Sequence, residues 1–204
     1  MCYRQCVKLL LVMLLAACWG SAPSTPPSNA AAPRARVAGV DTIPFTGNAA
    51  ARVKIISFYN YQCGHCVTFE PILDNIASKY GNRIVIYYRS LRLPAFHDND
   101  VPHLAALAAH RQGQFIAMHR ALFAAGAFDP ESVRGYAQKL GLDLERFERD
   151  LADPKLRARI TEDTAAAEAA DVAYVPYLII DGTPYEGDRE VGPLTTAIDA
   201  ALAR

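Results

Sequence analysis

Two short apolar runs flank a segment with helical spacing in the middle of the first half of the chain. Residues 53–59 and 84–88 are mostly apolar on both alternating faces, which is typical of buried central strands. Between them, apolar residues recur three and four positions apart, which predicts a helix from about Gly64 to Tyr80, with a kink at Pro71. A strand, a helix and a second strand of these lengths predict a βαβ unit with parallel strands.

The pattern then changes to helix throughout residues 98–170, where four or five short helices are expected to form a compact cap. Strand character returns at 177–180, followed by a tight turn at Asp181-Gly182, a return strand over 183–186 and a closing helix over 194–202. A short leading strand is expected within residues 37–45. The alternation of elements predicts an α/β fold with an inserted helical region.

The N-terminus has the pattern of a signal peptide over residues 1–17. Two basic residues precede an apolar run that is too short to span a bilayer. The run ends Leu15-Ala16-Ala17-Cys18, which resembles the lipobox of bacterial lipoproteins and implies cleavage before Cys18 and its lipidation. The alternative is an ordinary signal peptide and a soluble periplasmic protein. Residues 18–36 are rich in small residues and proline, so they are expected to form a flexible linker.

Composition narrows the function classes. The 204 residues carry a formal net charge of zero, so there is no basic surplus to suggest nucleic acid. Three of the five cysteines lie in the first eighteen residues, and the other two are Cys63 and Cys66. After processing at Cys18, the folded part would hold one cysteine pair and no disulfide framework, in an oxidising compartment.

The Cys63-Gly64-His65-Cys66 stretch lies where the first strand pattern ends and the helix begins. Unpaired N–H groups and the helix dipole favour a thiolate at such a position. Cys66, one turn on, can close a disulfide with Cys63. We therefore expect an exposed, activated thiol with a resolving partner, working by thiol–disulfide exchange without a cofactor.

Other interpretations of this pair remain open. It could be half of a zinc site, although no second pair of ligands exists, and no metal site is predicted. It could be a structural disulfide, or it could bind Cu(I) together with His65. His97, His103, His110 and His119 are interpreted as ordinary surface or core residues, and Tyr59 and Tyr61 as packing residues.

The order of elements resembles the thioredoxin fold, and more closely its DsbA-like branch with an inserted helical subdomain. The resemblance divides the chain into a first part over 37–97, a helical insertion over 98–170 and a second part over 171–204. The matching stretches are residues 58–66, Pro71, Leu93 to His97, Gln112 to Phe115, and Val175-Pro176.

The resemblance implies roles for individual residues. Cys63 would be the attacking nucleophile and Cys66 the resolving thiol, with His65 favouring the Cys63 anion. The Val175-Pro176 bond would be cis and would hold a substrate peptide opposite the disulfide. The chain departs from the family at Ser57, where members often have a buried acid that transfers protons.

These observations lead to one functional hypothesis. The protein is expected to be a thiol–disulfide oxidoreductase tethered through Cys18 on the periplasmic side of a bacterial membrane. It would form disulfides in unfolded or partly folded secreted proteins, act as a monomer, and be recycled by a membrane redox partner. The alternatives are a reductase or isomerase of the same fold, or a non-catalytic peptide- or copper-binding lipoprotein.

Overall fold

The computed structural model describes residues 43–93 and 100–204, and the account below concerns these residues alone. The predicted signal peptide over 1–17, Cys18 and the linker over 18–36 lie outside them. So do residues 37–42 and residues 94–97 of the stretch from Leu93 to His97 that carried part of the resemblance.

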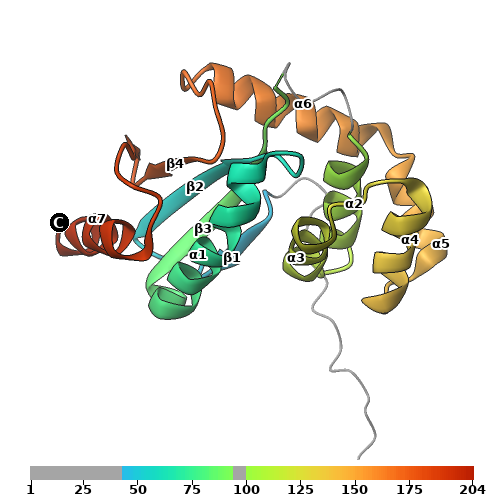
Figure 1. Ribbon diagram of the computed structural model, residues 1–204, viewed down its shortest axis with the longest axis horizontal. Helices are drawn as coiled ribbons and strands as arrows, with labels where there is room; N and C mark the ends of the chain where they lie inside the picture. Colours follow the sequence, from blue (N-terminus) through green and yellow to red (C-terminus); the bar gives the residue numbers. More distant parts are fainter. Residues whose placement is uncertain (1–42, 94–99) are drawn as a thin grey trace, which may run out of the picture. The chain divides into compact units, whose positions relative to one another are not determined.

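A five-stranded mixed sheet forms the centre of the fold, in the order β1-β3-β2-β4-β5 (Figure 1). Strands β2 and β3 are parallel, and every other neighbouring pair is antiparallel. The strands are β1 (Phe45–Gly47), β2 (Val53–Tyr59), β3 (Ile84–Ser90), β4 (Tyr177–Ile180) and β5 (Thr183–Pro184). The parallel pair confirms the predicted βαβ unit, and the two central apolar runs are buried as expected.

Helix α1 (Gly64–Tyr80) connects β2 to β3, and a short 3-10 turn, η1 (Gly81–Arg83), follows it. The helix continues through Pro71 and buries Phe69, Leu73 and Ile76. The C-terminal helix α7 (Val191–Ala203) packs against it, with the Tyr80 hydroxyl 2.8 Å from Asp199 Oδ1. Residue 63 is therefore at the start of a helix that packs against α7.

Five helices lie between β3 and β4, within the predicted number, and they gather beside the sheet (Figure 1). They are α2 (Val101–His110), α3 (Phe115–Ala125), α4 (Pro130–Lys139), α5 (Leu144–Leu151) and α6 (Pro154–Glu168). Asp129, Asp143 and Asp153 cap the last three, each accepting a bond of 2.9 Å from a backbone N–H in the first turn. These caps satisfy N–H groups that have no partner within the helix.

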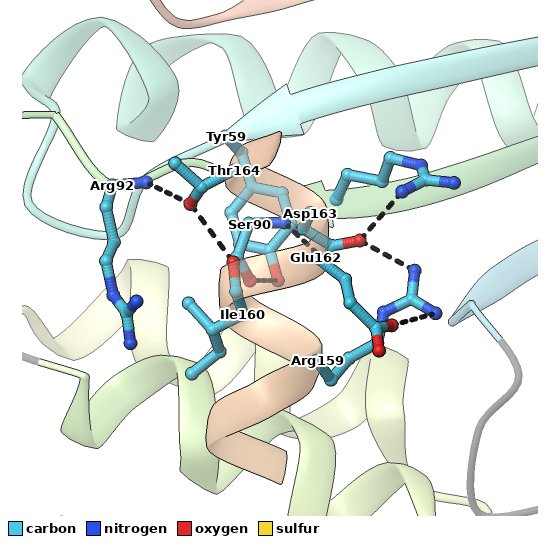
Figure 2. Close-up of polar contacts among 9 residues, drawn as sticks. Tyr59, Ser90, Arg92, Arg159, Ile160, Glu162, Asp163 and Thr164 are labelled. Atoms are coloured by element: carbon cyan, nitrogen blue, oxygen red, sulfur yellow. Dashed lines mark hydrogen bonds and ion pairs between the residues drawn. The ribbon is translucent and has the colours of Figure 1, made fainter. Parts of the chain in front are cut away.

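Asp163 ties α6 to the sheet. Its side chain is only 1% exposed, and Oδ1 accepts bonds from Arg89 Nη1 at 3.0 Å and Arg159 Nη2 at 2.6 Å. Oδ2 accepts a bond of 3.2 Å from the Ser90 backbone N–H at the end of β3. Figure 2 shows this carboxylate between the helix and the strand. Asp163 thus joins the helical insertion to the end of β3, the strand that is parallel to β2.

The second part of the fold differs from the prediction in its bounds. The return strand covers only Thr183–Pro184. The Tyr185 N–H still donates to Leu178 O at 2.9 Å, and the chain then turns, with the Tyr185 hydroxyl donating to Asp188 O at 2.8 Å. The closing helix is longer than 194–202. The tight turn is present, since Asp181 and Gly182 have φ values of 50° and 79°.

Candidate active site

Cys63 occupies the N-cap position of α1, and a single asparagine organises the turn that leads to it. Asn60 Oδ1 accepts a bond of 2.8 Å from Gln62 N, and the Asn60 carbonyl accepts one of 3.2 Å from Cys63 N. Asn60 Nδ2 donates to Leu91 O at 2.9 Å, which fixes the turn to the chain leaving β3. The first turn of α1 contains no acidic residue, so nothing there offsets the positive end of the helix dipole.

The cis peptide bond between Val175 and Pro176 faces this helix start, in the isomer that the resemblance implies. Cys63 Sγ lies 3.5 Å from Val175 O, so two segments 112 residues apart meet at the sulfur. The structure therefore brings together Cys63, Cys66 and the proline loop.

The prediction of an exposed Cys63 is wrong for this conformation. The two cysteines are free thiols here, and Cys63 is only 5% exposed. From the local sequence alone, a residue at the start of a helix is expected to be exposed to solvent. Here the loop at 174–176, distant in sequence, covers it. A hollow lies beside this loop, lined by neighbours of Cys63 but not by Cys63 itself.

That hollow has a volume of about 350 Å³ and a mainly apolar wall. His65, which is exposed, lies at its edge, and Val175 and Pro176 form another part of the wall. The remaining lining residues are Thr68, Phe69, Ile72, Tyr174 and Arg189. A hollow of this kind, next to a backbone carbonyl, suits an extended peptide with an apolar side chain.

Cys66 lies deeper than Cys63 and is 2% exposed. Burial is the main cause that raises the pKa of the Cys66 thiol well above its ordinary value. The neighbouring Cys63 sulfur and the Glu70 carboxylate raise this pKa further, while a backbone hydrogen bond from Asn60 opposes them. Cys66 is consequently a thiol, not a thiolate, at neutral pH.

Glu70, His119 and Tyr61 form a row of buried polar side chains next to α1, and the sequence analysis did not predict it. Glu70 is 7% exposed, and its Oε1 lies 3.1 Å from His119 Nε2 of α3. His119 is fully buried, and its Nδ1 lies 2.7 Å from the Tyr61 hydroxyl. His119 and Tyr61 are therefore more than packing residues. One signal was available: Glu70 interrupts the apolar face of α1, four positions after Cys66.

Within residues 43–93 and 100–204, no group of three or more His, Cys, Asp or Glu side chains is placed to bind a metal ion.

Within those same ranges, no helix combines the length and the apolarity needed to cross a membrane.

Comparison with known proteins defines the class. The family model described as thioredoxin matches residues 40–200, so the chain belongs to the thioredoxin family. A thioredoxin-like oxidoreductase from Silicibacter pomeroyi DSS-3 superimposes with a TM-score of 0.71 and 26% identity, covering 79% of this chain and 93% of that one. The thiol-disulfide exchange protein alpha-DsbA2 from Wolbachia pipientis has a TM-score of 0.70 and 21% identity, covering 78% and 86%.

The predicted thioredoxin-like fold is thereby confirmed, and it matches the fold of DsbA-like structures. Among curated proteins, the Na(+)/H(+) antiporter NhaA 1 of Salinispora arenicola is 33% identical over 159 residues. That match covers 77% of this chain but only 24% of the relative, so the chain spans about a quarter of that protein's length.

Proposed function

We propose that the protein is an oxidase that introduces disulfides into unfolded or partly folded secreted proteins. The observation that carries the proposal is the Cys63–Cys66 pair at the start of α1, with Cys63 Sγ 3.5 Å from the carbonyl before Pro176. Cys63 is the residue attacked, Cys66 is the resolving thiol, and the loop at 175–176 holds the substrate peptide.

The reaction starts from the Cys63–Cys66 disulfide. A substrate thiolate attacks Cys63 Sγ, the bond between the two enzyme sulfurs breaks, and its electron pair passes to Cys66 Sγ, which takes up a proton. A second substrate thiolate then attacks the substrate sulfur of the mixed disulfide. The substrate disulfide forms, and Cys63 leaves as a thiolate. A membrane redox partner then removes two electrons, Cys66 loses its proton, and the Cys63–Cys66 disulfide forms again.

The oxidising direction follows from what stabilises the reduced form. The N-terminus of α1, whose first turn holds no acidic residue, favours negative charge on a sulfur at its N-cap, and the family resemblance implies the same effect for His65. Stabilising the reduced state makes the disulfide a stronger oxidant. A reductase or isomerase would use the same residues, but its redox partner would supply electrons to the cysteine pair instead of removing them.

The proposed location is the periplasmic side of a bacterial membrane, with Cys18 as the lipid anchor and the protein acting as a monomer. The signal-like pattern over 1–17 supports it. A periplasmic thioredoxin-like protein from Salmonella enterica shares the fold, with a TM-score of 0.66. Labelling of the intact protein with a radioactive fatty acid tests the anchor, and loss of the label in Cys18→Ser is the expected result.

The redox potential tests the direction. Equilibration of the protein with glutathione is expected to give a potential of about −120 to −180 mV, whereas a potential near about −270 mV would indicate a reductase. His65→Gln should lower the potential, because the imidazole no longer favours the thiolate.

Oxidative refolding of a reduced protein substrate tests the catalytic class, with Cys63→Ala as the control. Activity should disappear in that variant. Peptide or Cu(I) binding without any Cys63-dependent refolding would support the binding-lipoprotein alternative instead.

A further inference from the structure

Among the described residues that line the hollow beside the proline loop, Arg189 alone carries a permanent charge. The wall around it is mainly apolar, and Arg189 itself is half-buried. A guanidinium in such surroundings has less contact with water than one on an open surface, so it interacts more strongly with an opposite charge. Its charge is therefore the feature of the hollow that best distinguishes one peptide from another.

Two tyrosines and a backbone carbonyl hold the Arg189 guanidinium in place. Its Cζ lies 5.7 Å from the centroid of the Tyr174 ring and 5.9 Å from that of Tyr185. Cations at about this distance from a ring face are attracted to it. Nη2 donates a bond of 3.3 Å to the Tyr174 hydroxyl, and Nη1 donates one of 3.0 Å to Gly187 O. The charge is therefore positioned before any peptide arrives.

These contacts do not neutralise Arg189. A guanidinium has five N–H donors, and the two bonds to Tyr174 and Gly187 use two of them. Within residues 43–93 and 100–204, no carboxylate forms an ion pair with Arg189, and Glu186 meets the Tyr174 hydroxyl instead, at 3.4 Å. The other donors suit a carboxylate, which arginine can bind through two parallel hydrogen bonds.

The proline loop connects this charge to the reacting sulfur. The Val175 carbonyl lies 3.5 Å from Cys63 Sγ, and Val175 also lines the hollow together with Tyr174 and Arg189. A peptide whose cysteine reaches Cys63 along this loop would therefore place side chains from neighbouring positions in the hollow, where they meet Arg189.

We propose that Arg189 selects substrates by binding a carboxylate close in sequence to the reacting cysteine. The preferred substrate is an extended segment with an apolar side chain in the hollow and an Asp or Glu side chain on the guanidinium. Arg189 acts on docking and takes no part in the sulfur chemistry. This inference rests on the exchange reaction proposed above and names the class of substrate that the reaction favours.

Oxidation of reduced two-cysteine peptides by the Cys63–Cys66 disulfide tests the proposal, with rate constants measured by acid quench and mass spectrometry. Paired peptides carry Glu or Gln at successive positions beside one cysteine, and their amidated C-termini leave the side chain as the carboxylate tested. For at least one position, the ratio of the Glu rate to the Gln rate should be about tenfold higher in the wild type than in Arg189→Gln. This is the lower end of what a hydrogen bond to a charged group contributes. Comparing ratios cancels differences in thiol reactivity between the peptides and any general loss of activity in the variant.

Two more variants test whether the charge itself is responsible. Arg189→Glu should prefer Lys peptides to Gln peptides, the reverse of the wild type. Arg83→Gln is the matched control, because Arg83 also lies over a tyrosine, 4.8 Å from the centroid of the Tyr80 ring, but outside the lining of the hollow. Arg83→Gln should keep the wild-type ratio, and a fall in this variant equal to that in Arg189→Gln would overturn the proposal.

The wild type alone gives a further test if the Arg189 variants do not fold. Its Glu-to-Gln ratio should fall towards one between about 20 mM and about 500 mM salt, because a partly exposed ion pair is screened. A ratio that does not change with salt, or that is the same in Arg189→Gln and the wild type at every position, would overturn the proposal. Oxidation of the Gln peptides would still support the proposed function, whereas a wild type that oxidises none of the peptides would overturn both.

Discussion

Replacing Asp163 with alanine removes the acceptor that joins α6 to the end of β3. The carboxylate is 1% exposed, while the side chains of Arg89 and Arg159 are 20% and 13% exposed. Two guanidinium groups with little access to water would lose a close counter-charge, although Arg159 also has Glu162 at 4.0 Å, and the Ser90 N–H would lose its acceptor. Removing one partner of a buried ion pair typically costs about 3–5 kcal/mol. For a domain of this size, that corresponds to a fall in Tm of about 6–20 °C.

Thermal unfolding followed by circular dichroism measures this effect. Glu148→Ala is the control, because Glu148 and Arg134 form an ion pair in which both side chains are 53% exposed. Such surface pairs contribute about 0–1 kcal/mol. The reasoning would be refuted if Asp163→Ala lowered Tm no more than Glu148→Ala does.

Three further predictions concern other elements. Burial opposes ionisation of Asp100, but Arg92 and Arg157 outweigh it and hold the pKa of Asp100 below its ordinary value. Its contribution is present above the unfolded pKa and lost as pH falls, so urea unfolding should show the stability gap between wild type and Asp100→Asn closing towards about pH 2. Gly47→Ala should cost about 1–3 kcal/mol in urea unfolding, because Gly47 has a φ of 89° and an added Cβ would clash with the backbone oxygen of Ile84, and an unchanged midpoint would contradict this. Cys66→Ala should accumulate a mixed disulfide at Cys63 with substrate, visible by mass spectrometry. Its absence, with active wild type, would argue against Cys66 as the resolving thiol.

Much of the fold is encoded locally. The helix over 64–80 was predicted with the bounds that the structure shows, because its apolar spacing, and the strand end before it, are properties of consecutive residues. The capping aspartates at 129, 143 and 153 are local in the same way, since each bonds an N–H within three positions. The two cysteines could be paired from sequence alone, because they lie one helical turn apart.

Tertiary structure alone decided what surrounds that pair. The Val175 carbonyl reaches Cys63 across 112 residues and closes over a thiol that its local position would leave open. Glu70 meets His119 because α1 and α3 pack against each other, and His119 in turn meets Tyr61. No periodicity within either helix specifies which of its residues will meet those of the other. Patterns along the chain reflect the backbone and its immediate neighbours. The burial and charge around a given sulfur depend on segments that only folding brings together.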